Sequence, residues 1–275
     1  FSRDDVKKSN TAENQFQCSA IENIPGIVFR TENGIMKTSP ATPVDMDRLV
    51  FPYDAEVLEQ TKGKILYYES SRGCPFHCSY CLSSEDNHVR FRSVDKVKAD
   101  LQVFLDARIP QVKFVDRTFN CNHERMTELL QYLSEQDNGI TNFHFEIGGD
   151  LLTEEEIFLL GKFRPGAVQL EIGVQTTNPE VMQRIGRVNK KDALFDNVRD
   201  LLQNAKQHVH LDLIAGLPGE DMQSFIRSFD EVYCLHPHQL QLGFLKVLGN
   251  TRIYRETDTY GIKYRLFLDR RGIFK

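Results

Sequence analysis

Three cysteines stand in one short segment, residues 71–81 with the sequence SRGCPFHCSYC. The segment directly follows an apolar stretch at residues 65–68 that is typical of a β-strand. The thiolates of Cys74, Cys78 and Cys81 can hold one metal centre from a single loop. A closed site needs four protein ligands, so three cysteines leave one position for a ligand that is not protein.

The spacing of this loop is compatible with three kinds of site. In the first, Cys74, Cys78 and Cys81 bind a [4Fe-4S] cluster that keeps one iron free. In the second, His77 is the fourth ligand of a structural zinc, although simultaneous ligation by the adjacent His77 and Cys78 is awkward. In the third, Cys78 and Cys81 form a thioredoxin-like redox pair, which normally opens a helix and leaves Cys74 idle. The pattern favours the cluster over zinc, and zinc over the redox pair.

The composition excludes several classes of function. The chain has 275 residues, enough for one large domain or two small ones, and 40% of them are apolar, which supports a sizeable core. A net charge of -5 gives no electrostatic signature for nucleic acid or an anionic membrane surface. No apolar run approaches the roughly 20 residues of a membrane span, and residues 2–14 are polar and charged, unlike a signal peptide. Cys18, Cys121 and Cys234 are scattered and are expected as small buried hydrophobes, so a reducing cytoplasmic location fits best.

The N-terminal part predicts an extension of the main domain. Residues 26–37 contain Asn33-Gly34 between short apolar runs, which predicts a β-hairpin. Residues 38–63 carry three prolines and predict an extended linker. We therefore expect an N-terminal extension and linker at 1–63, a main domain at 64–265 and a tail at 266–275. Because the chain begins with Phe1 instead of Met, we expect a longer natural protein.

Strands and helices alternate along the main domain. Six short apolar stretches predict β-strands, at residues 65–70, 111–116, 142–147, 168–174, 208–214 and 239–247. Helical patterns lie between them, beginning after Ser93 and Thr153 and spanning residues 124–136, 178–187, 193–205 and 220–235. Ser93 is expected to cap its helix, and Thr153 forms a capping box with Glu156. This alternation predicts an α/β fold with a parallel sheet, open or curled into a partial barrel, and places the chemistry at the carboxyl ends of the strands.

The loop and two later segments resemble one enzyme family. Three cysteines at this spacing, with Tyr80 before the last of them and a strand in front, resemble the radical S-adenosylmethionine (SAM) superfamily. Residues 170–176 (LEIGVQT) and 211–219 (LDLIAGLPG) are similar to its fourth and fifth strands in the branch of oxygen-independent coproporphyrinogen oxidase. Gln175 and Arg187 lie twelve residues apart, as the corresponding pair does in that branch. The resemblance extends to about residue 260 and implies a partial (β/α)6 barrel of parallel strands.

A second resemblance lies in the linker. Residues 24–30 and 45–53 are similar to the stretch that joins a cobalamin-binding domain to a radical SAM core. The Asp-x-His-x-x-Gly motif of such a domain does not occur in this chain. The resemblance therefore implies a cobalamin-associated protein whose cobalamin-binding domain lies upstream of Phe1.

The resemblance implies an enzyme whose cofactors are a [4Fe-4S] cluster, bound by the three cysteines, and SAM, bound to the free iron. An electron from the cluster would cleave SAM reductively and give a 5′-deoxyadenosyl radical, which abstracts hydrogen from a substrate that the sequence does not identify. Iron–sulfur oxidoreductases and methyltransferases both use such a core. A reductant such as flavodoxin or ferredoxin is the expected partner, and neither nucleic acid nor a membrane is expected.

The resemblance also gives roles to single residues, although it identifies no catalytic residue. The implied cofactor-binding residues are Tyr80 at the adenine, Asp116, Arg117 and Thr118 at the methionine amino group, Glu146, Gln175 and Asp212 at the ribose and its surroundings, and Arg187 at the methionine carboxylate. Without the resemblance, Tyr80 would be a packing aromatic, Glu146 a solvated charge and Arg187 a surface arginine. Glu171 is expected either inside the barrel or in a structural ion pair. Four histidines are interpreted as structural or solvated, namely His208, His210, His236 and His238.

Two alternatives from other classes remain at this point. One is a zinc-stabilised β/α protein without radical chemistry. The other is an iron–sulfur module with four protein ligands, in which Cys121, at the end of the second predicted strand, is the candidate fourth ligand. Such a module would transfer electrons and would not respond to SAM.

Overall fold

The computed structural model describes residues 21–86 and 88–264. The chain divides into two compact units, Phe1–Asp45 and Met46–Lys275, and each is described by itself. The expectations for residues 1–20 and for the tail at 266–275 lie outside the described residues.

The first unit contains the predicted hairpin. Strands β1 (Val28–Thr31) and β2 (Gly34–Lys37) pair antiparallel, with Thr31 opposite Gly34. Gly34 has a φ of +120°, which a residue with a side chain rarely adopts, so the Asn-Gly turn follows from backbone freedom at this position. The predicted hairpin is confirmed.

The second unit is built on one sheet of six parallel strands in the order β10-β9-β8-β7-β6-β3. The strands are β3 (Ile65–Tyr68), β6 (Gln111–Phe114), β7 (Asn142–Ile147), β8 (Val168–Gln175), β9 (His208–Ala215) and β10 (Gln239–Phe244). Strands β3 and β10 form the two edges and do not pair with each other among the described residues, so the sheet is open. All six strands lie where the sequence predicts them, and the partial parallel barrel is confirmed.

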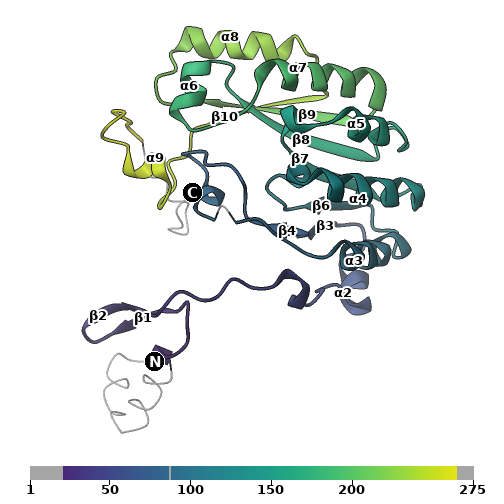
Figure 1. Cartoon of the computed structure of the whole chain (residues 1–275), viewed down its shortest axis with the longest axis horizontal. Helices are drawn as coiled ribbons and strands as arrows, with labels where there is room; N and C mark the ends of the chain where they lie inside the picture. The colour runs from purple at the N-terminus through teal and green to yellow at the C-terminus, as the bar shows by residue number, and fades with distance from the viewer. Residues whose placement is uncertain (1–20, 87, 265–275) are drawn as a thin grey trace. The chain divides into compact units, whose positions relative to one another are not determined.

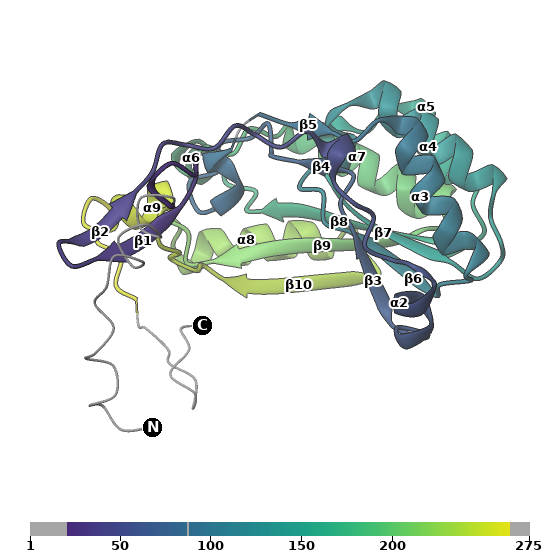
Figure 2. The ribbon, with the colours of Figure 1, turned by 90° about the horizontal axis from the view of Figure 1, so that it is seen from below.

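Helices follow one another along one side of this sheet (Figure 1). They are α2 (Ala55–Gln60), α3 (Val94–Asp106), α4 (His123–Glu135), α5 (Glu154–Leu160), α6 (Pro179–Arg184), α7 (Lys191–Asp200) and α8 (Met222–Tyr233), while the short α9 (Arg252–Arg255) lies apart from this layer (Figure 1). Figure 2 shows β9 and β10 side by side with α8 behind them. No helix in the described part of the chain is long and apolar enough to cross a bilayer.

Two helix termini differ in how well the sequence predicts them. The capping box is confirmed, because Thr153 Oγ1 accepts from the N–H of Glu156 at 3.2 Å and Glu156 Oε2 accepts from the N–H of Thr153 at 2.9 Å. Ser93 occupies the N-cap of α3, but its side chain makes no capping hydrogen bond. The predicted side-chain cap at Ser93 is therefore wrong, although the helix begins where expected.

The sheet separates an apolar face from a polar one. Along β8, Val168, Leu170, Ile172 and Val174 are buried, and burial of each such side chain contributes about 2 kcal/mol. The alternate residues of β8 point to the opposite, concave face and are Gln169, Glu171, Gly173 and Gln175. The apolar face packs under the helices, so the concave face is the one that carries polar chemistry.

Residues 46–63, which the sequence assigns to a linker, belong to the second unit. The rings of Phe51 and Tyr53 lie 5.3 Å and 5.1 Å from the ring of Phe104 on α3. The hydroxyl of Tyr53 also donates to the carbonyl of Tyr67 at 2.6 Å. These aromatic contacts fix a segment whose prolines alone indicate an extended chain.

Candidate functional site

The cysteine loop leaves β3 at the carboxyl edge of the sheet and folds back on itself. Gly73 has a φ of +101°, and a Cβ at this position would lie 2.5 Å from the carbonyl oxygen of His88. The N–H of Cys74 donates to the carbonyl of Asp86 at 3.1 Å. The short strands β4 (Ser71–Arg72) and β5 (Arg90–Phe91) then close the loop as an antiparallel pair. Gly73 is thus required by a close approach of backbone to backbone.

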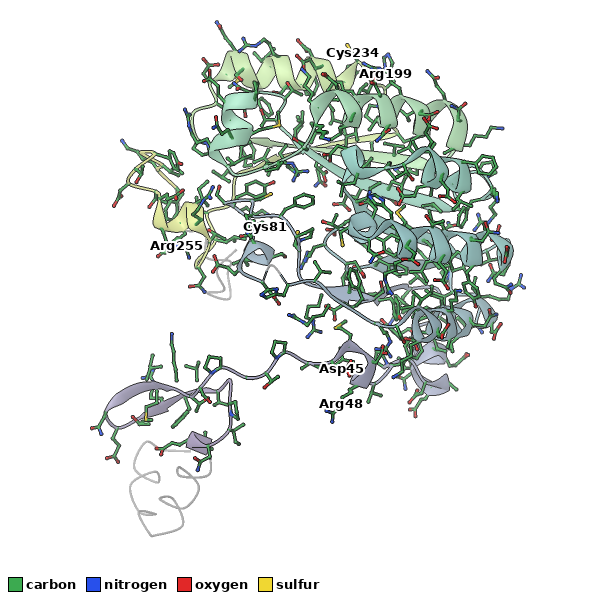
Figure 3. The ribbon with its side chains drawn as sticks, in the orientation of Figure 1. Asp45, Arg48, Cys81, Arg199, Cys234 and Arg255 are labelled. Carbon is green, nitrogen blue, oxygen red and sulfur yellow. The ribbon has the colours of Figure 1, made fainter. Side chains whose placement is uncertain are left out.

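The loop is fixed from two further sides. The N–H of Ser79 donates to the carbonyl of Ile185 at 2.8 Å, and the carbonyl of Ser79 accepts from the N–H of Ile253 at 2.9 Å. Arg255 and Glu85 form an ion pair at 3.2 Å, and Figure 3 shows Cys81 beside the segment that carries Arg255. Backbone bonds to α9 and to the end of α6 therefore hold the cysteines in place.

The thiols are largely shielded from solvent. Cys74 and Cys78 are buried and Cys81 is partly exposed. Burial raises the pKa of Cys74, and the backbone N–H of Phe76 and the hydroxyl of Thr118 oppose that rise. A metal centre with positive charge would favour the thiolate form that this burial disfavours.

Ligand spacing separates two of the predicted sites. A tetrahedral zinc with Zn–S bonds of about 2.3 Å holds its sulfurs about 3.8 Å apart. Within the described residues, the one set of three ligand atoms that all lie within 4.8 Å of one another belongs to Glu171, His210 and Asp212. The three loop thiols do not all lie within this distance of one another, so their spacing is wider than that of the sulfurs around a tetrahedral zinc.

Arg187 and Gln175 meet at this loop. Arg187 follows α6, and its guanidinium lies 3.8 Å from Cys78 Sγ and donates to the carbonyl of Gly173. Gln175 ends β8 with a φ of +71° after an irregular register between Gly173 and Gln175, a strained backbone of the kind found at functional sites. A Cβ on Gly173 would lie 2.2 Å from Gln175 Nε2. Gly173 therefore provides the space in which these two side chains lie.

Two buried polar atoms at this point lack partners. Arg187 Nε and Gln175 Oε1 are buried without a hydrogen bond. Groups of this kind are rare in folded proteins and indicate a missing ligand or water. An N–H donor of Arg187, whose guanidinium lies next to Cys78, and an amide oxygen of Gln175 match the carboxylate and hydroxyl groups of SAM, so these residues fit the predicted cofactor.

The segment at residues 116–118, predicted to bind SAM, follows β6, and its three side chains lie in different surroundings. Thr118 Oγ1 lies 3.7 Å from Cys74 Sγ, close to the predicted cluster. Arg117 is exposed. Asp116 is 1% exposed, and its two oxygens accept from Ser70 N (2.9 Å), Ser70 Oγ (2.7 Å) and Ser71 Oγ (2.5 Å). The Asp116 carboxylate is thus engaged within the protein, and the predicted contact of residues 116–118 with the methionine amino group, through backbone carbonyls or this carboxylate, stays a prediction.

Asp116 thus acts as a positioning residue for the loop entry. Ser70 and Ser71 directly precede Gly73 and the first cysteine. Arg125 on α4 donates to the carbonyl of Ser70 at 3.2 Å, next to the same carboxylate. Burial raises the pKa of Asp116, and the hydrogen bonds from both serines oppose that rise. The sequence analysis missed this network, because its members are ordinary serines and an arginine from distant segments.

Carboxylates and histidines gather on the concave face. Glu146 on β7 lies opposite Glu171 on β8, which lies opposite His210 on β9. Glu171 Oε2 lies 2.9 Å from His144 Nε2 and accepts from Lys113 Nζ at 3.1 Å. The hydrogen bond with His144 and the Lys113 ammonium lower the pKa of Glu171 to about 2 despite its burial.

Glu146, the residue predicted to bind the ribose hydroxyls, also lies on this face. Burial raises the pKa of Glu146, and the negative charge of Glu171 raises it further. Asp212 is the register partner of Gly173, so it projects beside the Gln175 region. Glu146 and Asp212 therefore lie on the same face as the loop residues, but in a more carboxylate-rich environment than the sequence indicates.

Apart from Asp116 and Arg117, the structure thus sorts the predicted site residues into two groups. Those around the loop are Cys74, Cys78, Tyr80, Cys81, Thr118, Gln175 and Arg187, and those on the concave face are Glu146 and Asp212. The sequence analysis missed Lys113 and His144, although both stand at concave-face positions of their strands. His210 is 5% exposed, so it is not a solvated histidine.

Comparisons with known proteins agree with this geometry. The sequence profile of the Radical SAM superfamily matches residues 68–232. An uncharacterised methyltransferase from Pyrococcus horikoshii is 24% identical over 212 residues, which cover 73% of this chain and 44% of the relative.

Solved structures of two enzymes share the fold. The radical SAM methyltransferase TsrM from Kitasatospora setae has a TM-score of 0.71 at 17% identity, over 92% of this chain and 53% of TsrM, and a second TsrM structure contains cobalamin and a [4Fe-4S] cluster. Coproporphyrinogen III oxidase from Escherichia coli has a TM-score of 0.52 at 19% identity, over 71% of this chain and 48% of the oxidase. The chain spans about half the length of these relatives.

A three-cysteine loop at the carboxyl edge of an open parallel barrel defines an enzyme with an iron–sulfur cluster. The chain belongs to the radical SAM superfamily. Membership implies a [4Fe-4S] cluster and SAM as its cofactors, and it confirms the predicted family and class of enzyme.

Proposed function

We propose that this chain cleaves SAM reductively at its cluster and uses the adenosyl fragment to abstract hydrogen from a substrate. The observation that carries the proposal is the pair of buried, unpartnered polar atoms, Arg187 Nε and Gln175 Oε1, in side chains that meet at Gly173, with the Arg187 guanidinium next to Cys78. When bound, the cluster supplies the electron that breaks a carbon–sulfur bond of SAM.

In this proposal, the protein side chains bind SAM, orient it and shield it from water. Arg187 would hold the methionine carboxylate, because its guanidinium is already fixed by Cys78 and by the carbonyl of Gly173. Glu146 would accept from the ribose hydroxyls and Tyr80, partly buried beside Arg187, would pack on the adenine. The helices behind the sheet and the loop over its edge exclude water from this position.

Cobalamin-assisted methyl transfer is the reaction class that we propose for the whole protein. The support is the fold shared with a cobalamin-containing methyltransferase and the similarity to an uncharacterised methyltransferase. A one-electron donor such as flavodoxin or ferredoxin is the partner that the reductive step requires. The substrate is not specified by these residues.

The test is product analysis after anaerobic reconstitution with iron and sulfide. Dithionite and SAM are added, and 5′-deoxyadenosine and S-adenosylhomocysteine are separated by chromatography. We expect 5′-deoxyadenosine from the wild-type chain and from Cys234→Ala, whose thiol is exposed and distant in sequence from the loop, and none from Cys78→Ala. Formation of S-adenosylhomocysteine alone would contradict the reductive step, and formation of neither product would contradict SAM chemistry altogether.

A further inference from the structure

Two carboxylates and one imidazole converge on the concave face of the sheet. Glu171 comes from β8, and His210 and Asp212 come from β9. Glu171 is the register partner of His210, and Asp212 stands two residues further along the same strand, so all three project from one face. One ligand atom from each lies within 4.8 Å of the other two.

His210 is the unusual member of this group. Its ring is 5% exposed, and neither ring nitrogen makes a hydrogen bond. Nε2 lies 3.1 Å from Asp212 Oδ1, which is an ion-pair distance, but the pair lacks hydrogen-bond geometry and Asp212 Oδ1 is unpartnered as well. Nδ1 therefore has no polar partner and Nε2 has only the Asp212 contact, and a buried imidazole with so few partners points to a ligand that is not protein.

We propose that Glu171, His210 and Asp212 form a binding site for one divalent first-row transition-metal cation. One imidazole nitrogen and two carboxylate oxygens are a donor set that suits such ions. Metal–ligand bonds of about 2.1 Å allow ligand atoms up to about 4.2 Å apart, so the three side chains need to move by less than about 1 Å. Rotation about their side-chain torsions supplies such a movement.

The charged side chains around Glu171 leave one of its carboxylate oxygens available to a cation. Lys113 and His144 both engage Glu171 Oε2, which leaves Oε1 for the cation. Glu146 adds a further carboxylate as the register partner of Glu171, and burial together with the charge of Glu171 raises its pKa. A cation at this point would relieve the repulsion between these carboxylates.

A protonated His210 paired with Asp212 is the competing explanation. The pKa of His210 is raised, mainly by the Asp212 carboxylate, while burial and the Lys113 ammonium oppose the rise. A cation must therefore displace a proton from His210, and its affinity should rise with pH. The experiment has to distinguish a bound cation from this ion pair.

The cation site shares Asp212 with the predicted sugar contact, but its occupancy can be measured apart from SAM cleavage. Each of the three residues supplies one ligand atom, so the second oxygen of Asp212 stays available for the predicted sugar contact. Binding can be measured without SAM and without a substrate. Failure of the proposed function would leave this site untouched, and failure of this site would leave the SAM chemistry untouched.

Mn²⁺ is the probe, because its paramagnetic signal reports binding and because it prefers carboxylate and imidazole over thiolate. The reconstituted holoprotein, with its cysteines occupied by the cluster, is titrated with Mn²⁺, and the free ion is quantified by EPR. Pulsed EPR then measures nitrogen coupling from an imidazole ligand. The variants are His210→Gln and Glu171→Gln, and the matched control is His236→Gln, whose ring is exposed.

We expect one Mn²⁺ per wild-type chain, with a nitrogen coupling and with displacement by Zn²⁺. We expect both site variants to bind at least tenfold more weakly, His210→Gln to lose the nitrogen coupling, and His236→Gln to match the wild type. Absence of stoichiometric binding to the wild type, or binding without nitrogen coupling, would overturn the proposal even if a variant failed to fold. Unchanged affinity in a folded His210→Gln chain would overturn it as well.

Discussion

We expect Asp116→Ala to destabilise the fold at the entry to the cysteine loop. The buried carboxylate accepts three hydrogen bonds, from Ser70 N, Ser70 Oγ and Ser71 Oγ. Alanine would leave these three donors without an acceptor and would remove the negative charge beside Arg125. Each buried donor without an acceptor costs about 1–3 kcal/mol, and local relaxation recovers part of the sum. The free energy of unfolding should therefore fall by about 3–5 kcal/mol.

The same structure predicts a smaller effect for Asp116→Asn. The serine hydroxyls can rotate to accept from the new amide, and its oxygen can still accept from Ser70 N, so a loss of about 1–2 kcal/mol is expected. Urea unfolding followed by circular dichroism measures both losses, and iron content after anaerobic reconstitution reports the state of the loop. Asp95→Ala, at an exposed position in the first turn of α3, is the control and should lose less than about 1 kcal/mol. An Asp116→Ala chain as stable as this control, with full iron content, would refute the reasoning.

Three further predictions concern the cofactor site and the concave face. Gly173→Ala places a Cβ 2.2 Å from Gln175 Nε2, so SAM affinity measured by equilibrium dialysis should fall at least tenfold, whereas Gly249→Ala, with no heavy atom within 4 Å, should bind as the wild type does. Glu171 has a pKa lowered from 4.5 to about 2, so it stabilises the fold above pH 4.5 and loses this effect as the pH falls towards 2. Glu171→Gln should therefore cost at most about 3 kcal/mol at pH 7 and much less near pH 2, and a pH-independent difference in urea unfolding would contradict this. Cys121→Ala should keep its four-iron cluster by iron analysis and EPR, and loss of the cluster would support four protein ligands instead.

Most of the fold is readable from local patterns. Alternating apolar residues mark the strands, and the Thr153 capping box marks the start of α5, because both signals depend on near neighbours in the sequence. The helix predicted at 193–205 is less regular, since α7 ends at Asp200 and continues as one π-helical turn to Ala205. Such a turn has no clear sequence signal. The packing of residues 46–63 onto α3 likewise depends on a distant partner, the ring of Phe104.

The candidate site, like the fold, could be predicted only where its residues are close together in the sequence. The cysteine loop was predictable because its ligands are neighbours in the sequence, and Gln175 and Arg187 because they lie in one strand–helix unit. Asp116 was predicted to be near the cofactor. It continues the alternation of the buried Val112 and Phe114 along the chain, so this pattern already indicated a side chain that points into the protein core. The contacts of Glu171 with Lys113 and His144 required the pairing of three strands, which no single stretch of sequence contains.

The central claim is that three cysteines leave one iron of the cluster for SAM. Electron–nuclear double resonance on the dithionite-reduced, reconstituted chain tests it directly, with SAM carrying ¹⁵N in the methionine amino group. We expect a strong ¹⁵N coupling to the cluster in the wild type. A reduced four-iron cluster with no ¹⁵N coupling, and with a spectrum that SAM does not change, would contradict the account.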